Sequence, residues 1–245
     1  MVVRSHTAFI FDIDGVIRDV SGSYRRALAD TVAEFAGDRP SAEEIDCLKA
    51  EGLWNNDWDA SCELIRRRGL VPDRERVVDF FQQRYRGNGF NGYIAGEPLL
   101  ATPEYFAGLT AAGVRWGFFS GATRASALFV LNRLAVNGAV LVAMEDAPGK
   151  PEPAGLWQAV DGLTGQGRPI RQVIYVGDTV ADMLTVGRAQ TSDREQRFIG
   201  IGVIPPHVPL ERRQTYTQQL RNAGAIQVVN SVLEVSIALL DSIPD

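Results

Sequence analysis

Short apolar runs recur along the chain, and segments that contain polar or turn residues separate them. Six of these runs are rich in β-branched or aromatic residues: Thr7–Phe11, Val114–Phe119, Ala139–Ala143, Gln172–Val176, Arg197–Val203 and Ile226–Val229. A strand that is covered on both faces reads as a continuous apolar run rather than as an alternating one. The pattern therefore predicts six strands of a sheet that is buried between helices.

Between the later strands, apolar residues recur at the three- and four-residue spacing of helices. This spacing predicts six helices: Thr102–Ala112, Thr123–Leu134, Ala154–Leu163, Val180–Arg188, Leu210–Asn222 and Ser231–Leu240. Strands that alternate with helices favour a parallel sheet with helices on both faces. We therefore expect an α/β fold with a Rossmann-like core.

The segment 18–95 breaks this alternation, because it contains no convincing strand. Three apolar stripes at helical spacing run through it: Tyr24, Leu28, Val32 and Phe35; Trp58, Cys62 and Ile65; and Val77, Phe81 and Tyr85. Such stripes are typical of helices that pack on one another. The sequence therefore predicts a helical domain of residues 18–95, inserted into a core of residues 1–17 and 96–245.

Composition and charge exclude several classes of protein. The 245 residues are 45% hydrophobic and 22% charged, which is ordinary for a globular protein. The net charge is -5 and no segment concentrates Lys and Arg, so nucleic acid is not expected as a partner. No apolar run is long enough for a membrane helix, and the first residues do not resemble a signal peptide. We expect a cytoplasmic monomer or homodimer, with Cys47 and Cys62 as small buried side chains.

Two carboxylates, Asp12 and Asp14, directly follow the first predicted strand and precede a turn at Gly15. Ligands of open α/β sheets bind at the carboxyl ends of the strands, where these side chains stand. A turn capped by Asp explains one such residue, but a pair in this place indicates chemistry. Carboxylates are the nucleophiles of enzymes that form an aspartyl phosphate. We therefore predict that Asp12 is a nucleophile and that Asp14 acts as acid and base.

Two further segments carry groups that suit an anion. Ser120 and Gly121 follow the second strand and precede a predicted helix, whose first amides attract anions. Lys150 lies in the loop Gly149–Pro153, where two prolines restrict the backbone and a lysine could neutralise a phosphoryl group. Taken alone, these segments are also compatible with an ordinary helix cap and with a solvated surface lysine.

The fourth group is formed by Asp178 and Asp182, which follow the fourth strand. Asp182 lies one helical turn beyond Asp178, so both carboxylates can face one point. Oxygen ligands suit a hard cation, and Mg²⁺ commonly links carboxylates to phosphate groups. The sequence therefore predicts a Mg²⁺ site here, although an Asp that caps the helix would explain one of the two residues.

In this order, FDIDGV, FFSG, GKPEP and VGDTVADM resemble the motifs of the haloacid dehalogenase superfamily, in the branch whose helical cap follows the first motif. The resemblance spans nearly the whole chain. It implies a Mg²⁺-dependent phosphatase that acts on a small phosphorylated metabolite through a phospho-aspartyl intermediate on Asp12. Asp14 would be the acid and base, while Ser120, Gly121 and Lys150 would hold the phosphoryl group.

The same resemblance implies the residues around the metal. Asp12, Asp14, Asp178 and Asp182 would form the Mg²⁺ site, with the carbonyl of Ile13 close to the ion. Carboxylates gathered around one point repel one another unless positive charge compensates them. A cation together with the lysine of the third motif would supply that charge.

Substrate choice is expected in the cap, because the core handles the phosphate. The candidate contacts are the polar and aromatic residues of the segment 49–59: Lys49, Trp54, Asn55, Asn56 and Trp58. In this family, such a cap segment reaches over the active site. A surface loop whose tryptophans pack against cap helices is the competing interpretation, and Asn before a helix is also a common cap.

Three other activities are compatible with parts of the pattern. A sugar-phosphate mutase of the same superfamily keeps the same core residues but returns the phosphoryl group to the substrate. Dehalogenation needs neither Mg²⁺ nor an acid at the second Asp, so Asp14, Asp178 and Asp182 argue against it. A non-catalytic binding protein on this fold usually loses a core carboxylate, and none is missing here.

Overall fold

The computed structural model describes residues 6–54, 56–165, 169–191 and 195–240. The chain forms two compact units, one of residues 1–18 and 99–245 and the other of residues 19–98. Their boundaries lie one and three residues beyond the expected ones. Arg18 belongs to the first unit because its backbone bridges to Asp14 and Leu99. Glu97 belongs to the second unit because its carboxylate accepts the hydroxyl of Ser23.

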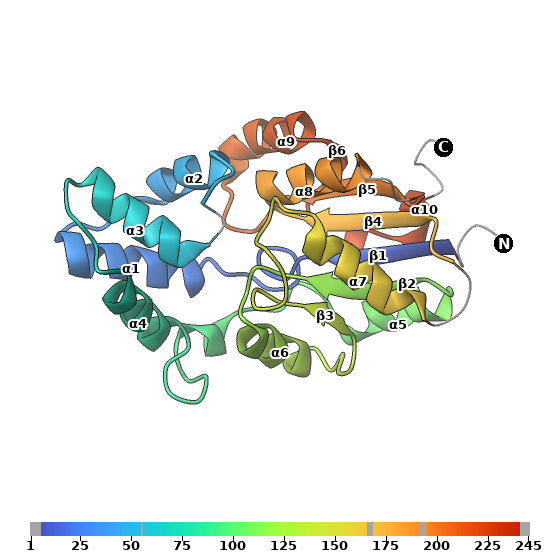
Figure 1. Ribbon diagram of the computed structural model, residues 1–245, viewed down its shortest axis with the longest axis horizontal. Coiled ribbons are helices and arrows are strands. Elements are labelled where there is room, and N and C mark those ends of the chain that lie inside the picture. Colours follow the sequence, from blue (N-terminus) through green and yellow to red (C-terminus); the bar gives the residue numbers. More distant parts are fainter. Residues whose placement is uncertain (1–5, 55, 166–168, 192–194, 241–245) are drawn as a thin grey trace. The chain divides into compact units, whose positions relative to one another are not determined.

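The first unit is built on a parallel sheet of six strands, in the order β3-β2-β1-β4-β5-β6 (Figure 1). The strands are β1 (Thr7–Phe11), β2 (Arg115–Phe119), β3 (Val140–Val142), β4 (Gln172–Gly177), β5 (Arg197–Val203) and β6 (Ala225–Val229). All six predicted strands are therefore confirmed, within one residue at each end.

The register of the central strands brings distant segments to one edge of the sheet. Phe11, the last residue of β1, pairs with Phe118 of β2 and with Val176 of β4. The strand order reverses between β1 and β4, because β2 and β3 follow on one side and β5 and β6 on the other. Such a reversal point is where open α/β sheets bind ligands. The residues that follow β1, β2 and β4 therefore meet at the binding edge.

Helices cover both faces of this sheet (Figure 1). The helices longer than one turn are α5 (Pro103–Ala111), α6 (Arg124–Arg133), α7 (Ala154–Thr164), α8 (Val180–Gln190) and α9 (Arg213–Asn222). Successive residues of β1 point to opposite faces: Phe9 and Phe11 join one core cluster, and Ala8 and Ile10 join another. Hydrophobic side chains form both clusters, which explains why the strands read as continuous apolar runs.

The expected helix 231–240 is wrong, because the chain forms two short turns there instead. A 3₁₀ turn spans Val232–Glu234, and the short helix α10 spans Ile237–Leu240. Ser231 caps the first turn by accepting the N–H of Leu233. The carbonyl of Val235 leaves the helical direction to accept the hydroxyl of Tyr105 at 2.7 Å. A tertiary hydrogen bond therefore overrides the local helical spacing.

In the residues that the structure describes, the second unit has four α-helices and a 3₁₀ turn. The helices are α1 (Tyr24–Ala36), α2 (Ala42–Ala50), α3 (Asp57–Arg67) and α4 (Arg74–Tyr85), and the turn spans Tyr93–Gly96. No strand occurs among the described residues of this unit, as expected. The aromatic ring of Tyr24 packs edge-on against Phe81 and Tyr85, so two of the predicted stripes meet.

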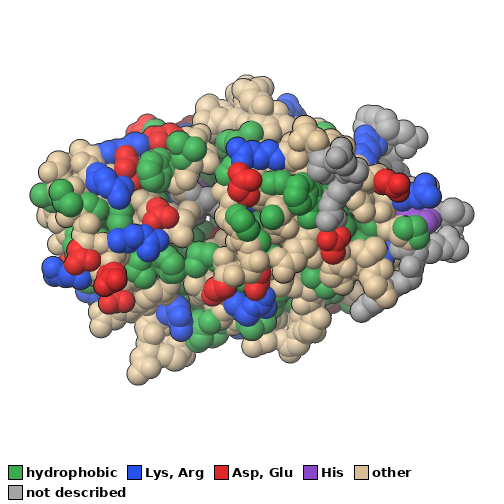
Figure 2. Space-filling view, in the orientation of Figure 1, with side chains coloured by type: hydrophobic (Ala, Val, Ile, Leu, Met, Phe, Trp, Pro, Cys, Tyr) green, Lys and Arg blue, Asp and Glu red, His purple; other side chains and the backbone are tan. Residues whose placement is uncertain are grey.

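Arginines on the second unit pair with acids at its surface. Arg67 contacts Glu51 and Glu63, and Arg68 contacts Asp38 and Glu44. On the face drawn in Figure 2, side chains of both signs are interspersed rather than segregated. Exposed pairs of this kind contribute little to stability and create no extended field.

Both cysteines were expected to be buried, and one of them is. Cys62 is buried as expected, but Cys47 is exposed on α2, because the apolar stripe of that helix is formed by Ile45 and Leu48. Within the part of the chain that the structure describes, no helix has the length and apolar character needed to cross a membrane.

Candidate active site

Asp12 stands at the carboxyl end of β1, between the ends of β2 and β4. Its N–H donates to the carbonyl of Val176 at 2.8 Å, which continues the sheet pairing by one residue. Its side chain is buried, with 5% of the residue exposed. Burial raises the pKa of Asp12 to about 7; Lys150 lowers it, while Asp182 and Asp14 raise it further. The carboxylate is therefore held at a site where its charge is poorly compensated.

Lys150 supplies positive charge from the loop between β3 and α7. Its Nζ lies 2.9 Å from Oδ1 of Asp12 and 2.6 Å from Oδ1 of Asp182, and 1% of the side chain is exposed. Burial alone would lower the pKa of Lys150, but the two carboxylates outweigh it and hold the pKa above its ordinary value. The ammonium therefore stays charged inside the core.

Asp182 is fully buried at the first turn of α8 and is saturated with partners. Its Oδ2 accepts the backbone N–H and the hydroxyl of Thr179, which caps the helix in return. Its Oδ1 faces Lys150 and accepts the hydroxyl of Tyr175 at 3.0 Å. Although burial raises the pKa of Asp182, Lys150 and the bonds from Thr179 lower it more, so the pKa lies below its ordinary value.

Asp178 follows β4 and lies against Gly15. An ideal Cβ on Gly15 would stand 2.1 Å from Oδ2 of Asp178, and the φ angle of Gly15 is +77°. Only glycine satisfies both the space and the backbone angle at this position. Burial, followed by the charges of Asp182 and Asp12, raises the pKa of Asp178 well above its ordinary value. The fold thus forces this carboxylate into a place that disfavours its ionised form.

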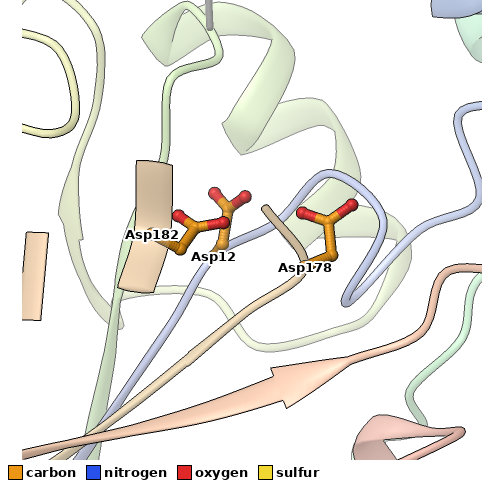
Figure 3. Close-up of side chains that lie close together, drawn as sticks. All are labelled: Asp12, Asp178 and Asp182. Atoms are coloured by element: carbon orange, nitrogen blue, oxygen red, sulfur yellow. The ribbon is translucent and has the colours of Figure 1, made fainter. Parts of the chain in front are cut away.

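Three carboxylates therefore converge from β1, the end of β4 and α8 (Figure 3). One oxygen from each of Asp12, Asp178 and Asp182 lies within 4.8 Å of the other two. The single ammonium of Lys150 contacts two of them, which leaves an excess of negative charge. Buried oxygens in this arrangement are the donor set of a hard divalent cation. Thr179, Tyr175 and Lys150 already contact both oxygens of Asp182, so Asp12 and Asp178 are better placed to ligate an ion, and the expected ligand role of Asp182 stays a prediction.

The carboxylate of Asp14 lies outside this group of oxygens, and its expected place among the metal ligands stays a prediction. Its Oδ1 lies 2.6 Å from Nε and 2.5 Å from Nη2 of Arg18, whose side chain is fully buried. The carbonyl of Ile13 also differs from expectation, because it accepts the N–H groups of Ile17 and Arg18 within the turn. Both groups are engaged by the turn that follows β1.

Ser120 and Gly121 stand at the end of β2, beside Asp12 in the sheet order. Ser120 is buried, its N–H donates to the carbonyl of Val142, and its Oγ accepts the N–H of Ala122 at 3.1 Å. Gly121 is exposed. Their expected contact with a phosphoryl group stays a prediction, and their position at the binding edge is compatible with it.

The candidate substrate contacts of the second unit have local structural partners. Lys49 donates to the carbonyl of Trp54 at 2.8 Å and lies 2.7 Å from Oδ1 of Asp57. Asn56 caps α3 by accepting the N–H groups of Trp58 and Asp59. The indole N–H of Trp54 donates to Glu51. Asn55 lies outside the described residues.

Two residues of the site escaped sequence reasoning. Arg18 is part of a turn and gave no periodic signal, yet it is the ion-pair partner of Asp14. Tyr175 reads as one more apolar residue of β4, yet its hydroxyl reaches the carboxylate of Asp182. A polar atom at the tip of an aromatic ring cannot be distinguished from core packing in a single sequence.

The sequence profile of the haloacid dehalogenase-like hydrolases matches residues 6–190, which include all four groups at the sheet edge. The chain belongs to this hydrolase family. Relatives of known structure show the same fold. A hydrolase from Pseudomonas syringae shares 21% identity over 98% of this chain and 100% of its own, with a TM-score of 0.68. A HAD family hydrolase from Deinococcus radiodurans, solved with bound phosphate and sodium, shares 21% over 96% and 95%, with a TM-score of 0.63.

One curated relative is named as a dehydratase rather than as a hydrolase. The imidazoleglycerol-phosphate dehydratase of Phytophthora nicotianae is 29% identical over 245 residues, which cover 95% of this chain and 50% of that protein. The chain thus spans about half the length of the curated relative that it matches.

Proposed function

We propose that this protein is a Mg²⁺-dependent phosphatase that hydrolyses the phosphate monoester of a small metabolite through a phospho-aspartyl intermediate on Asp12. The observation that carries the proposal is the buried Asp12 carboxylate, with the Lys150 ammonium 2.9 Å away and Asp178 beside it at the binding edge. A carboxylate attacks phosphorus only where positive charge spreads the developing charge of the phosphoryl oxygens.

The reaction needs two displacements at phosphorus. In the first, an oxygen of Asp12 forms a bond to phosphorus while the ester bond breaks, and Asp14 gives its proton to the leaving oxygen. In the second, Asp14 takes a proton from water, the water oxygen bonds to phosphorus, and the Asp12 carboxylate is released. Arg18 holds Oδ1 of Asp14 through Nε at 2.6 Å and Nη2 at 2.5 Å, and we assign the proton transfer to this carboxyl group.

The donor set fits the proposed Mg²⁺ ion. Asp12 and Asp178 would hold it, and Asp182 would keep Lys150 in place. When bound, Mg²⁺ supplies the positive charge that the three carboxylates lack and screens the oxygens of the phosphoryl group. Phosphate monoesters hydrolyse extremely slowly without a catalyst, so the site has to provide charge stabilisation of this kind.

The proposed substrate is a small organic phosphate. The relative from Deinococcus radiodurans was solved with phosphate, and the curated relative is named after a phosphorylated imidazole compound. We therefore extend the proposal to include phosphate esters that carry an imidazole ring among the candidate substrates. Lys49, Trp54, Asn56 and Trp58 remain our candidates for contacts to the leaving group, and Ser120 and Gly121 for contacts to the phosphate.

The test is phosphate release from a broad panel of phosphorylated metabolites, measured with Mg²⁺ and with EDTA. The panel contains sugar phosphates, phosphoglycolate, nucleotides, amino-alcohol phosphates and imidazole-bearing phosphate esters. Release from one or two members that EDTA abolishes is the expected result. Release that is equal in EDTA would contradict the metal requirement. Isomerisation of a sugar phosphate without release would replace the phosphatase with a mutase, and no turnover of any member would overturn the proposal.

A further inference from the structure

We propose that Tyr175 is a positioning residue, which fixes the carboxylate of Asp182 and thereby holds the Lys150 ammonium against Asp12. This inference rests on the proposed function, because that reaction is what makes the place of the ammonium important. Tyr175 lies on β4, three residues before Asp178, and its side chain is fully buried. It touches none of the reacting atoms, so its effect would pass through the two charged groups.

The hydroxyl of Tyr175 has one proton and two acceptors within reach. Oδ1 of Asp182 lies at 3.0 Å and the carbonyl of Phe119 at 3.2 Å. The carboxylate is the stronger acceptor because hydrogen bonds to ionised groups are stronger than those to neutral ones. Burial, together with the nearby carboxylates of Asp182 and Asp12, raises the pKa of Tyr175 well above its ordinary value. The hydroxyl therefore remains a donor, directed at Asp182.

This bond completes the set of contacts around Asp182. Thr179 occupies Oδ2 through its N–H and its hydroxyl, while Tyr175 and Lys150 share Oδ1. The carboxylate cannot rotate without breaking several of these contacts at once. Lys150 Nζ is thus anchored 2.6 Å from one carboxylate, and it reaches Oδ1 of Asp12 at 2.9 Å from that fixed point.

The ring of Tyr175 adds a second contact to the same ammonium. Lys150 Nζ lies 5.4 Å from the centroid of Tyr175 and 5.2 Å from the centroid of Phe119. Both distances are within the range of cation–π attraction. The two rings pack against each other with centroids 6.2 Å apart. Tyr175 therefore holds Lys150 directly through its ring and indirectly through its hydroxyl, and Tyr175→Phe separates the two effects.

The kinetic arm compares Tyr175→Phe with the wild-type protein on the best ester of the panel. We expect kcat to fall about tenfold with KM changed by less than about twofold, as for other groups that orient a ligand or a charge. Tyr175→Leu, which removes the ring as well, should lose more. The matched control is Tyr105→Phe, which also removes a tyrosine hydroxyl bond, here a partly buried one to the carbonyl of Val235 at 2.7 Å. Thermal melting verifies that each variant folds.

The spectroscopic arm needs neither substrate nor metal. The chain contains only two lysines, Lys49 and Lys150, so ¹⁵N-lysine labelling gives two side-chain ammonium signals. Lys49→Arg removes one of them and assigns the other. In the metal-free protein, Tyr175→Phe should shift and broaden the Lys150 signal and leave the Lys49 signal in place. Tyr105→Phe should move neither.

Two results would overturn the inference. One is a Tyr175→Phe variant with unchanged kcat and an unchanged Lys150 signal. The other is an equal loss of kcat in Tyr175→Phe and Tyr105→Phe, which would make the hydroxyl merely structural. If the wild-type protein released phosphate from no ester, the proposed function would be contradicted. The Lys150 signal would still show whether Tyr175 positions the ammonium.

Discussion

The chain's two lysines occupy environments that resemble each other at first sight. Each ammonium lies within 3 Å of a buried aspartate, Lys150 at 2.6 Å from Asp182 and Lys49 at 2.7 Å from Asp57. Lys49 also donates to the Trp54 carbonyl, and 20% of its side chain is exposed. The Lys49–Asp57 ion pair brings one ammonium to one carboxylate, and it joins α2 to the start of α3.

The surroundings of Lys150 are not balanced. It contacts Asp12 as well as Asp182, and Asp178 lies within the same group of oxygens. The carboxylates outnumber the ammonium, and burial prevents water from screening them. A Lys–Asp pair that is neutral overall stabilises a loop, whereas a pair inside an excess of carboxylates creates a site for a cation and a phosphoryl group. The difference lies in the neighbours and not in the pair.

The largest expected effect comes from Asp12→Asn, which removes the nucleophile without changing the size of the side chain. Turnover should fall by at least about a thousandfold while the protein stays folded, because an amide does not attack phosphorus. Phosphate release on the best substrate, together with a thermal melt, measures both. More than about a thousandth of wild-type activity would contradict covalent catalysis at this carboxylate.

The second-largest effect is the loss of kcat expected for Lys150→Met, with Lys49→Met as its matched variant. Lys150→Met should lower kcat by about 10²- to 10³-fold, because a donor to the phosphoryl oxygens is lost. Lys49→Met leaves Asp57 without its ammonium and should cost about 1–3 kcal/mol of unfolding free energy, with kcat on a generic aryl phosphate nearly unchanged. Denaturant unfolding and initial rates separate the two outcomes. The comparison fails if both variants lose kcat equally.

The third test concerns pH. The pKa of Asp12 is raised from an ordinary 3.8 to about 7 in the folded protein, and that of Asp178 is raised too. The folded protein therefore holds protons that the unfolded chain releases above pH 3.8. This stability is complete below that pH and is lost as the pH rises through about 7. The melting temperature of the metal-free protein should fall by several degrees between about pH 5 and about pH 8.

Mg²⁺ should reverse this trend, because a cation binds the ionised carboxylates. Millimolar Mg²⁺ should raise the melting temperature more at the higher pH than at the lower one. Asp178→Asn removes one carboxylate, so it should weaken both the pH trend and the effect of Mg²⁺. A melting temperature that is the same at both pH values would contradict the uncompensated charge that distinguishes Lys150 from Lys49.

The smallest expected effect is that of Trp54→Ala, which asks whether the Lys49 segment does more than hold a loop. If Trp54 contacts the leaving group, kcat/KM should fall about tenfold on the natural substrate and hardly at all on a generic aryl phosphate. Rates on both substrates give the ratio. An equal loss on the two would mark Trp54 as structural, in keeping with its indole bond to Glu51.

The order of residues was enough to predict the sheet and the order of the chemical groups along it. Continuous apolar runs predicted all six strands because both faces of the sheet are covered, and the groups at Asp12, Ser120, Lys150 and Asp178 were found because each follows a strand or opens a helix. These signals are local: a strand end and its next residues are neighbours along the chain. The helix 231–240 failed because Tyr105, far away in sequence, bonds to Val235.

Which carboxylates share one point depends on the folded chain, because it depends on contacts between segments that are distant in sequence. Asp14 is two residues from Asp12, yet Arg18 draws it out of the group, while Asp182 enters the group from another element. The raised pKa of Asp12 and the satisfied contacts of Asp182 follow from burial and from partners such as Tyr175. Electrostatic energy depends on the distance between charges and on the exclusion of water, and neither can be read from the sequence alone.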